Sequence, residues 1–130
     1  MATELREVLI PDYDIVETVH DGVALIEATQ RILPDAIVCD IAMPRVNGLA
    51  AAASILASRP DARIVFVSVQ DSRAVIKKAI DCGARGYVLK SDAGNELVAA
   101  VRTALEGGFY LSANARRILG MTVRPTPIDE

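Results

Sequence analysis

Two kinds of segment alternate along the chain. Short apolar runs that are mostly β-branched, each typical of a strand, cover residues 14–19, 36–39, 63–68 and 86–89. Longer stretches with apolar residues at helical spacing cover residues 21–32, 47–58, 71–82 and 92–106. Strands that alternate with helices of this length predict βαβ units and a parallel sheet.

Polar residues and helix breakers agree with these boundaries. A side chain that can accept a backbone N–H stands at the start of each expected helix, at Asp21, Asn47, Asp71 and Asp92. Helix-ending residues follow three of the helices, at Pro34, Pro60 and Gly83. The runs at 36–39 and 63–68 are almost continuously apolar, which is typical of strands covered by helices on both faces. We therefore predict a flavodoxin-like, doubly wound α/β fold with four parallel strands.

The two ends of the chain differ from this pattern. Residues 3–9 are predicted to be the end of a helix, and no strand precedes them in the sequence. Residues 112–119 favour one or two further helical turns, and residues 124–130, which include two prolines, favour a linker or tail. The expected organisation is one domain over residues 1–111, followed by a short helical segment and tail over residues 112–130.

Composition narrows the possible functions. The formal charge of −3 provides no basic surface, so we expect no DNA contact by this chain itself. Cys39 and Cys82 fit no zinc spacing, and the apolar run around Cys39 suggests a buried, reduced thiol in a cytoplasmic protein. No apolar stretch is long enough to span a membrane, and the N-terminus does not resemble a signal peptide.

Asp40 is the first residue with a chemical prediction. It follows a buried strand in the motif DIAMP, and chemistry in open α/β sheets gathers at the carboxyl ends of strands. A carboxylate in this position can attack phosphorus as a nucleophile. The plainer interpretation is that Asp40 caps the turn before Pro44.

Ser68 and Lys90 stand at the ends of the next two strands. A hydroxyl can donate to a phosphoryl oxygen, and an ammonium can neutralise its charge. Taken singly, each is more simply a loop hydroxyl or a solvated lysine. With Asp40 they place an acid, a hydroxyl and a cation at one edge of the expected sheet, and that combination is specific.

At these residues the chain resembles the receiver domains of two-component response regulators, especially those joined to LuxR/NarL-type helix-turn-helix domains. The segments PDAIVCDIAMPRVNGLAA, RIVFVSVQD and CGARGYVLKSDAGNELVAAVRTALEGGFYLS carry the resemblance, which runs from about Leu5 to Ser112. It implies that a histidine kinase phosphorylates Asp40 and that Ser68 and Lys90 contact the phosphoryl group. It also implies that Tyr87 is the aromatic switch residue, although a strand tyrosine can equally serve packing alone.

The chain departs from the family at its first strand. That strand normally ends in two adjacent acidic residues that hold Mg²⁺ beside the phosphoacceptor, and it is absent from this sequence. Asp40 and the carbonyl of Ala42 remain as Mg²⁺ ligands, whereas Asp12, Asp14 and Asp21 would substitute for the pair only along a rerouted backbone. The sequence does not distinguish an internal start at Met1 from a fragment of a longer regulator.

The missing strand is central in the family's sheet, so its absence leaves the strand at residues 36–39 with an unpaired edge. Either the strand expected at residues 14–19 moves over to pair with it, or a second chain supplies the partner. We expect a homodimer, in which the copies exchange elements to repair the sheet or meet through the last long helix. A smaller departure is Val69, where the family usually has a small residue. Its bulk is expected to narrow the approach to Asp40 or restrict Tyr87.

Two hypotheses follow, and neither makes the chain an enzyme. The first is a phosphoacceptor receiver that regulates an output, such as transcription through a DNA-binding domain outside this chain. The second is a degenerate receiver that binds partners without phosphorylation, as the missing acidic pair suggests. A flavodoxin-like enzyme or ligand-binding domain is a third, weaker reading, since no glycine-rich phosphate loop is present and His20 has no catalytic partners in the sequence.

Overall fold

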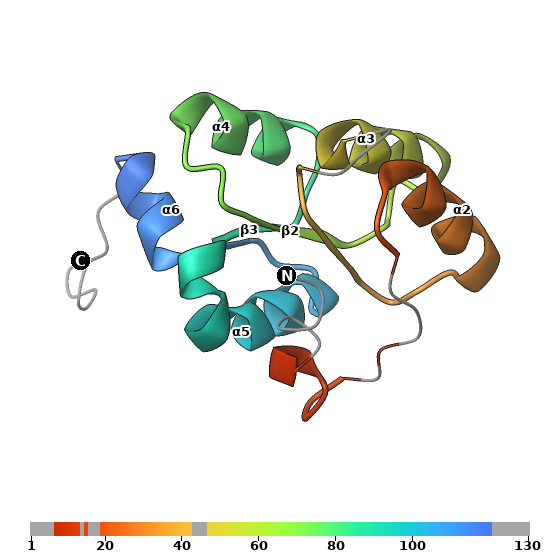
Figure 1. Ribbon diagram of the computed structural model, residues 1–130, viewed down its shortest axis with the longest axis horizontal. Coiled ribbons are helices and arrows are strands. Elements are labelled where there is room, and N and C mark those ends of the chain that lie inside the picture. Colours follow the sequence, from red (N-terminus) through yellow and green to blue (C-terminus); the bar gives the residue numbers. More distant parts are fainter. Residues whose placement is uncertain (1–6, 14, 16–18, 43–46, 121–130) are drawn as a thin grey trace.

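The computed structural model describes residues 7–13, 15, 19–42 and 47–120. Its elements follow the alternation that the sequence predicts (Figure 1). In chain order they are α2 (Gly22–Ile32), β1 (Ile37–Cys39), α3 (Gly48–Ser58), β2 (Ile64–Ser68), α4 (Arg73–Asp81), β3 (Gly86–Leu89), the 3-10 helix η1 (Lys90–Asp92), α5 (Ala93–Leu105), β4 (Tyr110–Leu111) and α6 (Ala113–Ile118). None of the helices in this part of the chain has the length and apolar character needed to cross a membrane.

The four strands form one parallel sheet in the order β1-β2-β3-β4. In register, Cys39 of β1 lies beside Phe66 of β2, and Ser68 of β2 lies beside Leu89 of β3. Because all pairs are parallel, the residues that follow each strand leave the sheet at the same edge. This confirms the predicted four-stranded α/β architecture.

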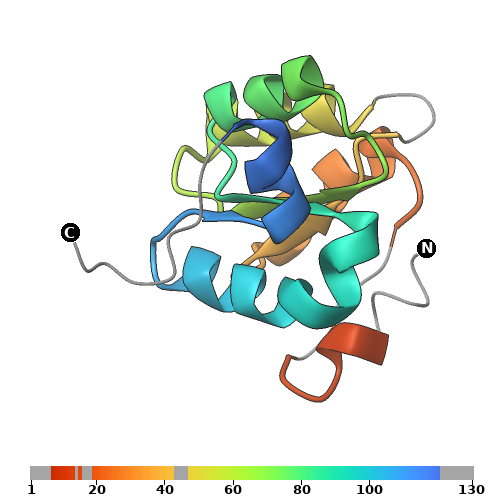
Figure 2. The ribbon, with the colours of Figure 1, turned by 90° about the vertical axis from the view of Figure 1, so that its left-hand side faces the viewer.

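Helices cover both faces of the sheet. Helices α2, α3 and α4 lie on one face, and α5 lies on the other with the segment around residues 7–13 (Figures 1 and 2). Strand β2 shows why its sequence is continuously apolar, since Ile64 and Phe66 belong to one core cluster while Val65 and Val67 belong to the other. All four side chains are fully buried, so both faces of β2 are covered over these residues, and the polar Ser68 stands only at the end of the strand.

One predicted strand lies mostly outside the described residues, and one observed strand was not predicted. Residues 15 and 19 are not in a strand, and the rest of the predicted strand at 14–19 lies outside the described residues. The fourth strand of the described residues is Tyr110–Leu111, which pairs with β3 through Gly86 and Tyr87. Two residues are too few to show an alternating pattern, so only the pairing with β3 defines this strand.

The helix starts are partly confirmed. Asp21 and Asn47 accept the backbone N–H groups of residues 24 and 50 at 2.8 and 2.9 Å, as N-caps should. At α4 the cap is Ser72 rather than Asp71, and at α5 the Asp92 side chain makes no capping bond. The Asp92 carboxylate turns instead towards α6.

The predictions for the two ends of the chain are tested only in part. Residues 7–9 are helical, as expected for the end of a helix, and the helical segment predicted over 112–119 is present as α6. Residues 3–6 and the predicted tail at 124–130 lie outside the described residues. The boundary after residue 111 stays a prediction, although β4 and α6 pack on β3.

Candidate functional site

Asp40 leaves the sheet directly after β1. Its side chain is half-buried, and its Oδ1 accepts the backbone N–H of Ala42 at 3.1 Å. This bond is the turn-capping interaction that the sequence offered as the plainer role of Asp40. A carboxylate that caps its own turn is also held in one orientation, so capping and chemistry are compatible.

Gly48 fixes the position of this turn. The N–H of Gly48 donates to the carbonyl of Ile41 at 2.8 Å, and a Cβ on Gly48 would lie 2.1 Å from the carbonyl oxygen of Asp40. Because that neighbour is backbone, it cannot swing away as a side chain can. The start of α3 therefore packs directly on the turn that carries Asp40, and only glycine allows this contact. Sequence reasoning missed Gly48, although the motif NGLAA at a helix start was a usable signal.

Ser68 and Lys90 reach the same edge of the sheet. Ser68 is fully buried, and its Oγ accepts the backbone N–H of Gln70 at 3.0 Å. Lys90 follows Leu89, the register partner of Ser68, and opens η1 with an exposed side chain. The acid, the hydroxyl and the lysine thus follow three neighbouring parallel strands in one direction.

Tyr87 belongs to a network with Ser68 and Gln70. The buried Tyr87 hydroxyl donates to the carbonyl oxygen of Gln70 at 2.7 Å, while the N–H of Gln70 donates to Ser68. Burial raises the pKa of Tyr87 to about 12, a hydrogen bond with Ser68 opposes this rise, and the negative charges of Asp40 and Asp71 add to it. Gln70 was not predicted as a site residue, because it contacts Ser68 and Tyr87 through its backbone N–H and carbonyl, which nearly every residue type has.

Cys39 stands next to Asp40 but is not prepared for nucleophilic attack. The side chain is buried, and its Sγ donates to the carbonyl of Asp40 at 3.3 Å. Burial, followed by the negative charge of Asp40, raises the pKa of the Cys39 thiol to about 12. The thiol therefore stays protonated near neutral pH, as the prediction of a buried reduced cysteine implies.

The described residues do not fit a magnesium site of the family's kind. No group of three or more His, Cys, Asp or Glu side chains among them could hold a metal ion. Asp21 is engaged as the N-cap of α2, Asp12 is exposed in a turn, and Asp14 lies outside the described residues. Asp40 and the carbonyl of Ala42 are the remaining oxygen ligands, and we derive no step through the metal.

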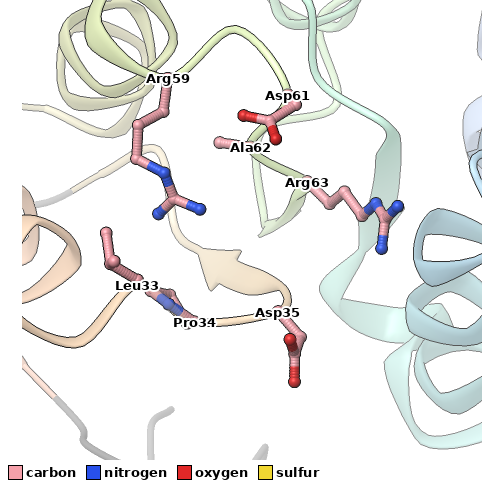
Figure 3. A pocket seen from close by; sticks show the side chains of 7 residues that line it. All are labelled: Leu33, Pro34, Asp35, Arg59, Asp61, Ala62 and Arg63. Carbon is pink, nitrogen blue, oxygen red and sulfur yellow. The ribbon is translucent and has the colours of Figure 1, made fainter.

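A pocket lies at the opposite edge of the sheet. It is formed by the segments that precede β1 and β2 and is lined by Leu33, Pro34, Asp35, Arg59, Asp61, Ala62 and Arg63 (Figure 3). Figure 3 shows Arg59 and Asp61 entering it from the turn between α3 and β2. None of the predicted site residues lines this pocket, so the candidate site is the edge that carries Asp40.

The fold and this edge define a class of protein. The response regulator receiver domain family matches residues 1–102, which is more than half of the chain. The chain therefore belongs to the response regulator receiver domain family, as the resemblance of its motifs indicated.

Characterised relatives agree with this assignment. The transcriptional regulatory protein DegU of Brevibacillus brevis is 32% identical over 101 residues, 78% of this chain and 43% of the relative. The transcriptional regulatory protein MctR of Rhizobium johnstonii is 38% identical over 88 residues, 68% of this chain and 41% of the relative. The chain thus spans less than half the length of these two relatives.

Solved structures show the same fold. A two-component response regulator of the LuxR family from Aurantimonas sp. SI85-9A1 superimposes with a TM-score of 0.87 at 27% identity, covering 91% of this chain and 86% of that one. The receiver domain of the response regulator NarL from Mycobacterium tuberculosis gives a TM-score of 0.76 at 28% identity, covering 81% and 86%.

Proposed function

We propose that this receiver domain accepts a phosphoryl group on Asp40 from a histidine kinase. A carboxylate oxygen of Asp40 attacks the phosphorus of the kinase's phosphohistidine and forms a P–O bond. The P–N bond breaks, and its electron pair returns to the histidine nitrogen, which takes up a proton. The product is an acyl phosphate on Asp40 and a neutral histidine on the kinase.

Ser68 and Lys90 would stabilise the charge that this transfer brings to the site. The Ser68 hydroxyl can donate to one phosphoryl oxygen, and the Lys90 ammonium can offset a negative charge as a point cation. The observation that carries the proposal is the common exit of Asp40, Ser68 and Lys90 from three neighbouring parallel strands.

Tyr87 would sense the modification through Gln70. When Ser68 turns towards a phosphoryl group, its bond with the Gln70 N–H weakens, and the Gln70 carbonyl that holds the Tyr87 hydroxyl moves with it. Phosphorylation acts in this way as a local change of charge that shifts the preferred conformations of the loop at Gln70 and of the buried Tyr87 ring. The expected output is transcriptional regulation, as the names of the longer relatives suggest, and not catalysis.

Intact mass after incubation with acetyl phosphate tests the proposal, with and without Mg²⁺. We expect one phosphoryl adduct on the wild type and on the control Asp35→Asn, which changes an exposed carboxylate at the far edge of the sheet. Asp40→Asn should form no adduct. A folded wild type without an adduct in either condition would refute the proposal, and the comparison of the two conditions measures how far the reaction depends on Mg²⁺.

A second candidate function is a partner-binding domain that is not phosphorylated. It is favoured by the lack of a metal-binding carboxylate group among the described residues. The two functions differ in a simple way, because a binding domain would interact equally well with its partner after Asp40→Asn.

A second copy of the chain is a further expected partner. Among the described residues β1 pairs only with β2, and a strand at the edge of a sheet can pair with a strand from another chain. We therefore expect a homodimer, with exchanged elements or with contacts along α5. Light scattering that shows a monomer at high protein concentration would contradict this expectation.

A further inference from the structure

Helix α6 is held at its start by two carboxylates from the elements that follow Lys90. Asp92, the last residue of η1, accepts the Asn114 backbone N–H at 3.1 Å and the Asn114 Nδ2–H at 2.6 Å. Glu96 of α5 accepts the N–H of Ala113 at 3.1 and 3.2 Å. These bonds satisfy backbone donors that a helix start leaves without partners, and the negative charges lie at the positive end of the helix.

The other end of α6 is held by the element that follows Ser68. The Arg73 guanidinium, in the first turn of α4, donates to the carbonyl of Leu119 at 2.7 Å. Helix α6 thus lies between the starts of α4 and α5 (Figures 1 and 2). It connects the two segments that leave the sheet directly after the hydroxyl and the lysine of the candidate site.

These polar contacts add to limited apolar packing and to the bond that Arg116 Nε donates to the carbonyl of Leu111 at 2.8 Å. The helix spans six residues, which is far too short for independent stability. Its only fully buried side chain is Ala115, whereas Ile118 and Leu119 are half-buried against the core around Tyr87. The docked position of α6 therefore depends strongly on Asp92, Glu96 and Arg73.

We propose that α6 is a latch that opens when Asp40 is phosphorylated. The inference rests on the proposed function, because it requires Lys90 to move towards a phosphoryl group. Lys90 and Asp92 share the single turn of η1, so a shift of Lys90 displaces the Asp92 carboxylate as well. Hydrogen bonds weaken steeply when their distance and angle change, so a small displacement is enough to release Asn114.

Ser112, directly before α6, is hydrogen-bonded to β3. Its Oγ accepts the Leu89 N–H at 3.1 Å, and its own N–H donates to the carbonyl of Tyr87 at 3.0 Å. Both bonds are to β3 and not to η1. The chain therefore stays attached up to Ser112 while α6 is released as a unit from that residue onwards.

Amide hydrogen exchange of the Ala113–Ile118 segment tests the latch, with beryllofluoride as the phosphoryl mimic on the full chain. We expect exchange to become about tenfold faster when the mimic binds, which corresponds to the loss of one charged hydrogen bond. Asp92→Asn should show the faster exchange without the mimic and gain little from it. The control Asp81→Asn, which changes an exposed carboxylate at the end of α4, should behave as the wild type.

Because Asp92 is buried, Asn114→Ala serves as a second variant that removes the Nδ2 donor from the other side of the bond. It should also exchange faster without the mimic. The latch is refuted if the mimic binds and exchange in α6 is unchanged, or if Asn114→Ala and a folded Asp92→Asn both match the wild type. Failure of the proposed function gives a different result, because acetyl phosphate then forms no adduct on Asp40 while both variants still loosen α6. That result would overturn the coupling between Asp40 and α6. It would still support the role of the Asp92–Asn114 hydrogen bonds in holding α6.

Discussion

On one side of the sheet, β1 has three residues and pairs with β2 alone among the described residues, and Val38 at its centre is half-buried. On the other side, β3 lies between β2 and β4, and Val88 is fully buried. The β3 side is also tied to α6 through Ser112. The carboxylate of the candidate site, Asp40, follows the less buried strand β1. Lys90 follows the fully buried strand β3, and Tyr87 lies within it.

The two sides of the sheet therefore have different structural roles. On the β1 side the structure positions Asp40 by close backbone contact in a turn, with few side chains involved. On the β3 side hydrogen bonds join Ser68, Gln70 and Tyr87, and others join Asp92 to Asn114. Substitutions should therefore affect the position of the acid on one side and stability or coupling on the other.

The largest effect should come from two glycines, one on each side. Gly48→Ala places a methyl group 2.1 Å from the Asp40 carbonyl oxygen and should cost about 3 kcal/mol or more, since backbone must move. Gly94→Ala in α5 meets no atom within 4 Å and should stabilise by about 0.5 kcal/mol. Urea unfolding followed by circular dichroism measures both, and equal effects would refute the assigned contact.

Two valines test the packing difference directly. Val88→Ala opens a cavity in the cluster between the sheet and α5, and it should cost about 2–3 kcal/mol. Val38→Ala removes the same atoms from a half-buried position and should cost about 1 kcal/mol. Thermal and urea unfolding of the two variants should rank them in this order. The reverse order would mean that β1 is the better packed strand.

Tyr87→Phe tests the buried hydroxyl through pH. The pKa of Tyr87 is raised from 10 to about 12, so the unfolded chain loses this proton first as the pH rises. The contribution to stability is fully present below pH 10 and is lost between pH 10 and pH 12, at about 1.4 kcal/mol per pH unit. Unfolding free energies across this window should fall less steeply in the variant by that amount. Identical slopes would contradict the burial of the hydroxyl, because the other groups whose pKa burial raises, Cys39, Cys82 and Tyr110, are present in both proteins.

The smallest effect should come from two helix caps. Asn47→Ala removes a 2.9 Å bond at the start of α3 and should cost about 1 kcal/mol. Ser72→Ala removes a longer bond of 3.4 Å at the start of α4, and it should cost about 0.5 kcal/mol. Both can be measured by urea unfolding. A larger loss from Ser72→Ala than from Asn47→Ala would contradict the ranking of the two caps by bond length.

The sequence alone determined the parallel α/β fold and which candidate site residues stand at the strand ends. Apolar runs such as 63–68 require cover on both faces, and parallel strands require their carboxyl ends to share an edge. Asp40, Ser68 and Lys90 could therefore be assigned to one region from the sequence, and the resemblance to the receiver family added Tyr87. Of the predicted strand at 14–19, residues 15 and 19 are not in a strand, and the others lie outside the described residues.

Only the tertiary structure decided how these residues are connected. Tyr110–Leu111 is a strand because β3 lies beside it, and Asp92 anchors α6 instead of capping α5 because Asn114 comes within reach. Gly48 and Gln70 act through backbone atoms, which leave no signature in residue type. Local sequence determines which conformation each segment prefers, whereas contacts between distant segments determine which partner each polar group finally has.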